Sequence, residues 1–503
     1  YGLEKGEKIE EVVSGIGSDG TNAFKVEVSQ IPDLNLTEHL SRLIHYPHGC
    51  MEQSTSAIFP QVALLSVLKE DDESKKQIHS FIKAYLNKMK MLQSHEGGFK
   101  LWNGDSYPDL WVSSYVGHAM IEIEKQGYEW PVGMKENWIS FQQQRARSWR
   151  RPTQNSNRYY RRSEDMVQAY RLYTLALMGK PELGAMNRMK QLTNINTSVK
   201  WRLAAAYALA GQKSTAKAMV NQLGMGVEEY DFSALTYGSP LRDKAMILET
   251  LVKLEENDKA FEMAIEVAKE LNNGSWYGTQ TTAYSLIGLA EFMKTRNSDI
   301  ISFNYQINGK GEALNTKAAV HNIAVNSKIQ ETFTLNLENT SEEKIYVRII
   351  NEGQPKVGLE QPVKKGLNVT VVYTDRDGFP IDVSELKQGT DFIAKVNVAK
   401  NGNLRGYQNM ALTQIFPSGW EIINLRLMGR EQSESQFRYR DYRDDRVMTY
   451  FSLPSTKSVS YEVWLNAAYG GEYYLSGPKV EDMYDNRIEC ITEGKWVKVV
   501  PSR

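Results

Sequence analysis

The chain has 503 residues, of which 41% are hydrophobic, and a formal net charge of −1 at pH 7. This balance gives no general attraction to nucleic acid or to anionic membrane surfaces, and no apolar run reaches the roughly 18 residues that a membrane-spanning helix needs. The length exceeds what one hydrophobic core organises, so roughly two to four domains are expected.

Two cysteines and seven histidines limit the metal and redox chemistry of the chain. Two cysteines are too few for a disulfide scaffold, and no cysteine–histidine cluster has the spacing of a zinc site. We therefore expect no metal and no other cofactor. The chain begins with Tyr1 and shows no signal peptide, so we expect a mature protein or a part of a longer one.

The first 30 residues are polar and end in an alternating segment, Phe24 to Val28, that predicts a β-strand. A single strand cannot fold alone. We therefore expect it to pair with strands after residue 300, so that residues 1–30 and 299–366 form a small β domain. The region between them, residues 31–298, would then be an insertion in that domain.

Residues 31–298 predict one helix after another, separated by glycine and proline. Apolar residues recur at helical spacing in several blocks, of which one comprises Ile78, Phe81, Ile82, Tyr85, Leu86 and Met89. Two glycine turns with an aromatic residue, at 96–99 and 273–276, each precede a helix. Such a repeat is typical of an α/α toroid. An irregular helical bundle is the alternative.

From Ile300 the hydrophobic period changes to two, which predicts short strands. These strands are expected at 302–307, 333–337, 345–350, 369–373, 392–398 and 458–465. Hairpin turns are expected at 375–378 and 400–403. About 200 residues of short strands predict β-sandwich-like domains, the last one at 367–503. The expected fold class is multidomain α+β.

Cys50 lies three residues before Gln53, a spacing that permits unusual chemistry. Loss of ammonia would join the Cys50 sulfur to the Gln53 acyl carbon in a thioester ring of roughly 15 atoms, since a turn keeps such residues within bonding reach. Two other interpretations remain open at this point. Cys50 could be a buried structural thiol, or a nucleophile that uses His45 or His48 as its base.

The residues around Cys50 form a longer motif. They read Tyr46-Pro47-His48-Gly49-Cys50-Met51-Glu52-Gln53-Ser54-Thr55-Ser56. This stretch closely resembles the thioester signature of bacterial α2-macroglobulins, Tyr-Pro-x-Gly-Cys-x-Glu-Gln-Thr-x-Ser, and departs from it at Ser54. Other stretches resemble the same family in the same order, at 97–99, 239–245, 279–283, 416–422 and 480–484. The resemblance covers nearly the whole chain.

The resemblance implies a fold and a function. It implies an α/α toroid that carries the thioester, inserted in or flanked by a small β domain, and a C-terminal macroglobulin-like β-sandwich. It also implies a covalent protease trap and not an enzyme. In this family a protease cleaves a bait segment and thereby exposes the thioester, which then acylates an amine of the protease once.

The resemblance also assigns roles to single residues. A thioester must be kept dry until it is triggered. Its expected cover is formed by Met483 and Tyr484, with Tyr473 and Tyr474 nearby in the sequence, although ordinary core packing is the alternative for each tyrosine. Gly49, Glu52 and Tyr46 are expected to support the thioester loop. Cys490 is expected to be a buried thiol.

The histidines bear on the acceptor that the thioester prefers. Complement-type members of the family use a distant histidine of the thioester domain to pass the acyl group to hydroxyls. No histidine occurs between residues 119 and 320 of this chain, where that residue would be expected. We therefore expect direct reaction with amines.

Partners and compartment follow from the same resemblance. The expected partners are target endopeptidases, bound covalently, and upstream macroglobulin domains of the same parent chain, because no bait region is recognisable here. The parent is expected to be periplasmic or in the cell envelope, with lipid anchoring through an upstream part as one option.

Seven arginines at 145–162 are more typical of a solvated inter-helix segment than of a nucleic-acid site. The alternative function is a toroid enzyme, a prenyl-type transferase or a cysteine hydrolase using Cys50.

Overall fold

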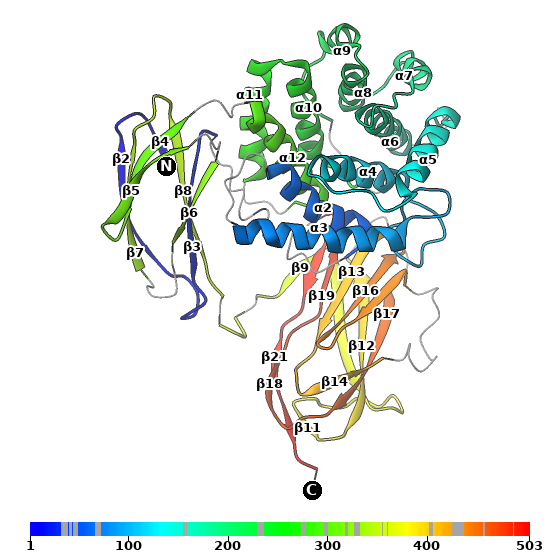
Figure 1. Cartoon of the computed structure of the whole chain (residues 1–503). Helices are drawn as coiled ribbons and strands as arrows, with labels where there is room; N and C mark the ends of the chain where they lie inside the picture. Colours follow the sequence, from blue (N-terminus) through cyan, green and yellow to red (C-terminus); the bar gives the residue numbers. More distant parts are fainter. Residues whose placement is uncertain are drawn as a thin grey trace. The chain divides into compact units, whose positions relative to one another are not determined.

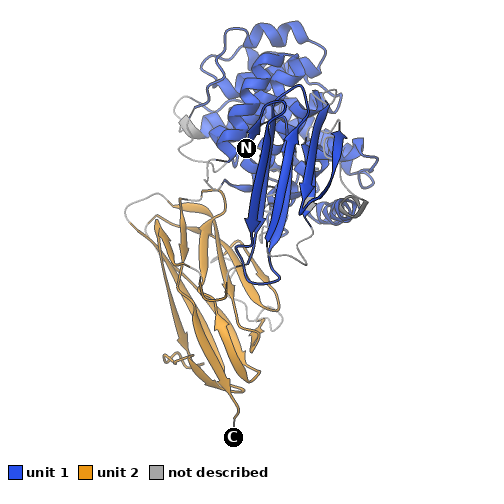
Figure 2. Ribbon diagram, turned by 90° about the vertical axis from the view of Figure 1, so that its left-hand side faces the viewer, with its two compact units in different colours: residues 1–354 blue, residues 355–503 orange. Residues whose placement is uncertain are grey.

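The chain divides into two compact units, residues 1–354 and residues 355–503 (Figure 2). The computed structural model describes residues 1–503 apart from 32–38, 40–42, 44–48, 66–71, 154–155, 157, 229–235, 273–276, 296–299, 317–319, 326–331, 355, 360, 402–405, 425–436, 456–457, 486 and 503.

Among its described residues, the first unit contains two four-stranded sheets, ordered β1-β8-β3-β6 and β2-β7-β4-β5. Their strands are β1 (Gly2–Leu3), β2 (Lys8–Ser14), β3 (Ala23–Ser29), β4 (Ile301–Ile307), β5 (Lys310–Thr316), β6 (Val320–Val325), β7 (Thr332–Asn339) and β8 (Ile345–Glu352). The N-terminal strand β3 is central and pairs antiparallel with β6 and β8, both after residue 300. Alternate residues of both sheets, such as Val26, Phe333 and Leu335, share one hydrophobic core.

Between these strands the chain forms a closed double ring of helices (Figure 1). The helices are α2 (Met51–Leu64), α3 (Asp72–Leu92), α4 (Leu110–Lys125), α5 (Met134–Ser148), α6 (Arg158–Leu177), α7 (Leu183–Lys190), α8 (Thr197–Leu209), α9 (Lys213–Val220), α10 (Pro240–Leu254), α11 (Asn257–Leu271) and α12 (Thr279–Thr295). The inner ring consists of helices that each pack on the next, and its last helix packs on its first to close the ring. In order, these helices are α2, α4, α6, α8, α10 and α12. The odd-numbered helices pack outside them. The predicted α/α toroid is confirmed.

The sequences of the helices explain which ring each one joins. In α11 the buried residues recur every three or four positions, from Ala260 to Leu271, so the opposite face of this helix is exposed to solvent. Helix α12 is buried from Thr279 to Ala290 without interruption, and its many Thr, Ser, Ala and Gly residues allow close packing on both sides. Helix α12 thus has the pattern of an inner helix that packs on both sides, whereas α11 has the amphipathic pattern of an outer helix.

Charged and aromatic side chains fill part of the toroid interior. The Arg202 guanidinium on α8 donates to Glu249 on α10 at 2.8 Å and lies 4.3 Å from the ring centroid of Tyr173. Tyr173 also donates to Glu249. Burial opposes ionisation of Glu249, but Arg202 and Lys253 hold the pKa of its carboxyl below the usual range. This buried network of an ion pair, a hydrogen bond and an aromatic contact ties α6, α8 and α10 together.

The described residues of the second unit form three sheets. Figure 1 shows this unit as strands without helices. The three sheets are ordered β10-β12-β17-β14, β15-β16-β13-β19-β20-β9 and β11-β21-β18. The strands are β9 (Val363–Lys365), β10 (Leu367–Thr374), β11 (Glu385–Lys387), β12 (Asp391–Lys400), β13 (Tyr407–Ile415), β14 (Trp420–Ile423), β15 (Tyr439–Tyr442), β16 (Arg446–Leu453), β17 (Val459–Ala467), β18 (Gly471–Leu475), β19 (Lys479–Asp482), β20 (Glu489–Ile491) and β21 (Lys495–Val500).

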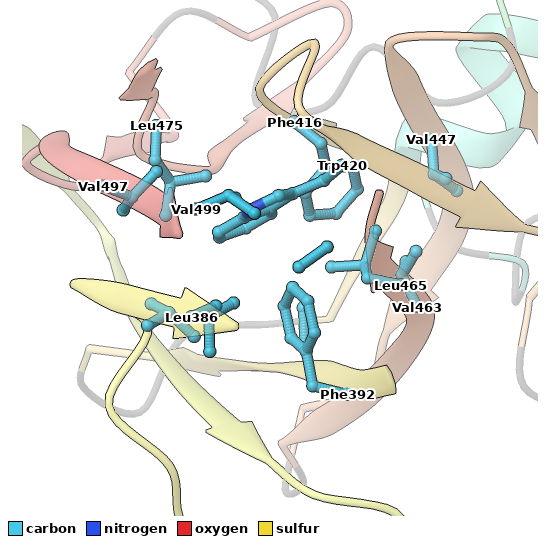
Figure 3. Close-up of a cluster of buried hydrophobic side chains, with 13 residues drawn as sticks. Leu386, Phe392, Phe416, Trp420, Val447, Val463, Leu465, Leu475, Val497 and Val499 are labelled. Carbon is cyan, nitrogen blue, oxygen red and sulfur yellow. The ribbon is translucent and has the colours of Figure 1, made fainter. Parts of the chain in front are cut away.

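Side chains from different sheets share the cores of this unit. One core gathers residues of all three sheets around Phe392 and Trp420, whose rings meet edge to face at 4.8 Å between centroids (Figure 3). A second core lies around Val396, Leu412 and Phe451. The expected C-terminal β-sandwich and the multidomain fold class are confirmed.

Two expectations concern the limits of this unit and of its strands. The small β domain was expected to end at 366, and strand β9 lies before that limit but pairs antiparallel with β20 of the second compact unit. The hairpin turn expected at 400–403 includes residues outside the described part of the chain, and the strands before and after it, β12 and β13, belong to different sheets. No local pattern signals the long-range partner of β9.

Candidate functional site

Cys50 and Gln53 lie together at the N-terminus of α2. Cys50 is the N-cap of the helix in an extended conformation, and the two residues form a reciprocal capping box. The Gln53 backbone N–H donates to Cys50 Sγ at 3.5 Å, and the Cys50 backbone N–H donates to Gln53 Oε1 at 3.2 Å. Cys50 is 1% and Gln53 3% exposed. The helix cap thus holds the thiol and the side-chain amide on one turn.

Glu52 is buried beneath the same turn, where it links two helices of the inner ring. Its Oε1 accepts the Ser56 hydroxyl at 2.7 Å, and its Oε2 accepts the Thr279 hydroxyl of α12 at 3.0 Å. Ser56 in turn lies 3.1 Å from the Tyr115 hydroxyl of α4. Burial raises the pKa of Tyr115, and the nearby Glu52 carboxylate raises it further, so the phenol stays protonated. Glu52 therefore fixes α2 to α12 directly and to α4 through Ser56.

Of the other two residues expected to support the loop, Gly49 is described by the structure and Tyr46 is not. The Gly49 carbonyl accepts a hydrogen bond from Lys88 Nζ of α3. Tyr46 lies outside the described residues, as do His45 and His48. Backbone contacts also anchor the start of α2, because Met51 N–H donates to Leu101 carbonyl oxygen at 3.0 Å.

This arrangement suits nucleophilic attack by sulfur on the glutamine side chain. The N-terminus of an α-helix carries partial positive charge, which favours a thiolate and a developing oxyanion. If Sγ attacks Cδ of Gln53, the S–C bond forms, the C–N bond breaks, and the amide nitrogen leaves as ammonia with the thiol proton. The capping box brings both reacting groups to this positive end of the helix.

The four residues expected as a cover fall on two different sheets of the second unit. Met483 and Tyr484 directly follow β19 in the six-stranded sheet, where the Met483 N–H donates to the Asn409 carbonyl oxygen at 2.9 Å. Tyr473 and Tyr474 lie on β18 in the three-stranded sheet. Tyr473 packs against the core around Trp420, and Tyr474 contacts Trp496. The two pairs therefore belong to different sheets of the second unit.

The turn that carries Met483 and Tyr484 is held by Asp482. Its Oδ1 accepts the Tyr484 N–H at 3.0 Å. Burial raises the pKa of the Asp482 carboxyl to about 7, and the neighbouring Asp485 carboxylate adds to this effect. The aspartate is thus uncharged in the folded chain at pH values where the unfolded chain has already ionised it.

We predict that Asp482→Asn makes the second unit less sensitive to pH. Because the folded pKa of Asp482 is raised, its contribution to stability is present below about pH 4 and is lost as the pH rises towards 7. The variant should therefore gain about 4 kcal/mol of unfolding free energy at pH 8 and little at pH 4. Thermal unfolding at both pH values measures this. The exposed Asp377→Asn in the same unit is the control, and an equal gain at both pH values would contradict the prediction.

The remaining motifs have structural explanations. Four arginines of the segment 145–162 form ion pairs, namely Arg145 with Glu96, Arg147 with Glu182, Arg151 with Asp165 and Arg162 with Glu228. In the part of the chain that the structure describes, no group of His, Cys, Asp or Glu side chains has the arrangement of a metal site. No helix among the described residues is long and apolar enough to cross a bilayer.

Two residues near Cys50, Thr279 and Lys88, were not predicted from the sequence. Thr279 lies in the stretch 279–283 that was noted for its family resemblance, so that resemblance was the available signal. Lys88 is one of several lysines on an amphipathic helix and carries no local signal. Its contact with Gly49 arises only because the ring packing places α3 against α2.

Two family models match the chain. They are the "A-macroglobulin TED domain" over residues 24–257 and the "Bacterial Alpha-2-macroglobulin MG10 domain" over residues 366–486. The α2-macroglobulin of Escherichia coli K12 is 22% identical over 495 residues, which cover 90% of this chain and 28% of that protein. The chain thus spans about a quarter of the curated relatives that it matches, since the share is 24% for the relative from Pasteurella multocida.

Solved structures show the same fold. The native E. coli α2-macroglobulin spanning domain MG7 to the C-terminus aligns with a TM-score of 0.82 at 20% identity, covering 100% of this chain and 81% of that one. The Salmonella α2-macroglobulin reacted with methylamine also gives 0.82 at 21% identity, covering 100% of this chain and 33% of that one.

Proposed function

Since this chain belongs to the bacterial α2-macroglobulin family and corresponds to its C-terminal portion, we propose that Cys50 and Gln53 form an internal thioester. The observation that carries this proposal is the capping box, in which the thiol and the amide of one buried turn already contact each other's backbone. The thioester would serve the parent protein as the reactive group of a covalent protease trap.

The chemistry of trapping follows from the same geometry. An amine nitrogen of the protease attacks the Gln53 acyl carbon, the C–S bond breaks, and one amine proton goes to the Cys50 sulfur. The product is an amide and a free thiol, which does not return to the thioester. The chain is therefore consumed by one event and is a single-use inhibitor, not an enzyme. Its partners would be endopeptidases and the upstream macroglobulin domains of the parent.

The proposed cover of the thioester is the turn with Met483 and Tyr484. This turn is held in a defined conformation by Asp482 and by the carbonyl group of Asn409. Methionine and tyrosine offer apolar surface that can exclude water from a thioester. Tyr473 and Tyr474 are less suited to this role, because each is engaged within its own sheet.

Titration of thiols tests the proposal. The chain has two cysteines, Cys50 and Cys490. Under denaturing conditions at about pH 7, with the alkylating reagent present from the start, we expect only one to be alkylated before methylamine treatment and both afterwards. Two reactive thiols in the untreated protein would contradict the thioester.

We further predict that the thioester prefers amines to hydroxyls. No histidine occurs between residues 119 and 320, and His118 is buried in the toroid, where burial lowers its pKa to about 3. Equal concentrations of methylamine and glycerol should therefore yield mainly the methylamide. Peptide mapping at Gln53 measures both products, and predominant glycerol ester would show that another group transfers the acyl group to hydroxyls.

The domain division and the compartment are parts of the same proposal. Residues 31–298 would be the thioester domain, inserted in a β domain that contains residues 1–30 and the strands from 299 to 354. The parent protein would reside in the periplasm or the cell envelope, where it would meet foreign proteases.

A further inference from the structure

Lys88 on α3 contacts the backbone of the proposed thioester loop. Its Nζ donates a hydrogen bond to the carbonyl oxygen of Gly49. The approach is close, because a Cβ atom at Gly49 would lie 3.3 Å from Nζ. Gly49 therefore leaves room for a cation beside the peptide group that joins it to Cys50.

The N–H of the same peptide group points towards the side-chain carbonyl group of Gln53. The N–H of Cys50 belongs to the Gly49–Cys50 peptide and donates to Gln53 Oε1 at 3.2 Å. In a trans peptide the C=O and N–H point in opposite directions. The Gly49 carbonyl group can therefore accept from Lys88 on one side while the Cys50 N–H donates to Gln53 on the other. The hydrogen bonds therefore run in series from Lys88 through this peptide to Gln53.

We propose that Lys88 is a positioning residue that polarises the Gly49–Cys50 peptide and so strengthens the Cys50 N–H as a donor to the Gln53 acyl oxygen. The inference rests on the proposed thioester. Hydrogen bonds in series polarise one another, and a cationic donor at one end strengthens the next bond. The Gln53 oxygen becomes an oxyanion both when Sγ displaces ammonia and when an amine displaces Sγ.

The surroundings of Lys88 increase its effect. Lys88 lines a mainly apolar surface pocket of about 220 Å³, together with Ser54, Ala57, Ile58, Gln61, Phe81, Ala84 and Tyr85 of α2 and α3. Apolar walls lower the local dielectric constant, so that a nearby charge is screened less than in water. The positive N-terminus of α2 acts in the same direction.

The expected effect of removing Lys88 on the rate of acyl transfer can be bounded. Removing a direct oxyanion donor slows acyl transfer about 10²–10³-fold in enzymes. Lys88 acts through a peptide and does not touch the oxygen, so a smaller loss of roughly tenfold is expected. A purely structural lysine would change stability without changing the carbonyl group of a thioester that has already formed.

The test compares Lys88→Met and Lys88→Arg with the unchanged chain, and Lys83→Met, an exposed lysine of the same helix, is the matched control. Two quantities are measured on protein whose intact mass shows the loss of ammonia. One is the rate constant for opening by methylamine, and the other is the infrared stretch of a ¹³C-labelled Gln53 carbonyl. We expect K88M to slow opening roughly tenfold and to raise the stretching frequency, because the hydrogen bond to the carbonyl oxygen weakens. K88R should keep both within about twofold, as should K83M.

The outcomes separate this inference from the proposed function. Unchanged rate and frequency in K88M would overturn the role of Lys88 and leave the thioester standing. An unchanged chain that lacks the loss of ammonia would overturn both. A folded K88M that forms no thioester, while K88R forms one, would support the inference, since formation uses the same oxyanion. If K88M does not fold, Lys88→Gln provides the neutral variant, with the same slower opening and higher frequency expected.

Discussion

Replacing Cys50 with serine is expected to abolish methylamine incorporation while leaving the fold intact. A serine hydroxyl cannot store the acyl group as a thioester, so the variant should retain the Gln53 amide and its full sequence mass. Serine is also among the best N-cap residues, so α2 should form as before. Intact mass before and after methylamine measures the first effect, and the thermal unfolding midpoint measures the second.

The second cysteine supplies the matched control. Cys490 is buried on β20, in a different unit of the chain, so Cys490→Ser should keep both the loss of ammonia and the reaction with methylamine. If Cys50→Ser incorporated as much methylamine as the unchanged chain, an acyl donor other than Cys50 would be responsible.

Replacing Glu249 with glutamine is expected to destabilise the toroid strongly. Glu249 is 1% exposed and accepts from both Arg202 and Tyr173, so neutralising it leaves the Arg202 guanidinium buried without its counter-charge. Breaking such a pair costs about 3–5 kcal/mol. For a domain of this size, the unfolding midpoint should fall by roughly 6–12 °C.

Two further variants separate loss of the buried pair from a general effect of removing charge. Glu266→Gln removes a half-exposed carboxylate that pairs with Lys244, and should change the midpoint little. The double variant Arg202→Met with Glu249→Met removes both charges and should recover part of the loss, because a buried pair is replaceable by apolar groups. If Glu249→Gln were as stable as Glu266→Gln, the network would not hold the inner ring together.

The sequence predicted those features whose signal is local. Alternation at Phe24 to Val28 predicted a strand, and period two marked β4, β7, β8, β10, β12 and β17. The glycine turns and helical periodicity predicted the toroid. The spacing of Cys50 and Gln53 gave the candidate site, and the capping box shows why it is possible: an N-cap residue and the third residue of a helix face each other.

The features that the sequence did not predict depend on contacts between distant segments. Strand β9 joins β20 more than 120 residues later, and nothing within residues 363–365 signals that partner. Tyr473 and Met483 are close in sequence, yet β18 and β19 belong to different sheets. Lys88 reaches Gly49 only through the packing of α3 on α2. Proximity in sequence was therefore a poor guide wherever the chain changes sheet or helix.

The central claim is that Cys50 and Gln53 are joined by a thioester, and the intact mass before and after methylamine tests it most directly. The account predicts a chain lighter than its sequence by one ammonia. After treatment, the chain should gain the mass of one methylamine, located at Gln53, together with a free thiol at Cys50. A chain with its full sequence mass and no gain from methylamine would contradict the account.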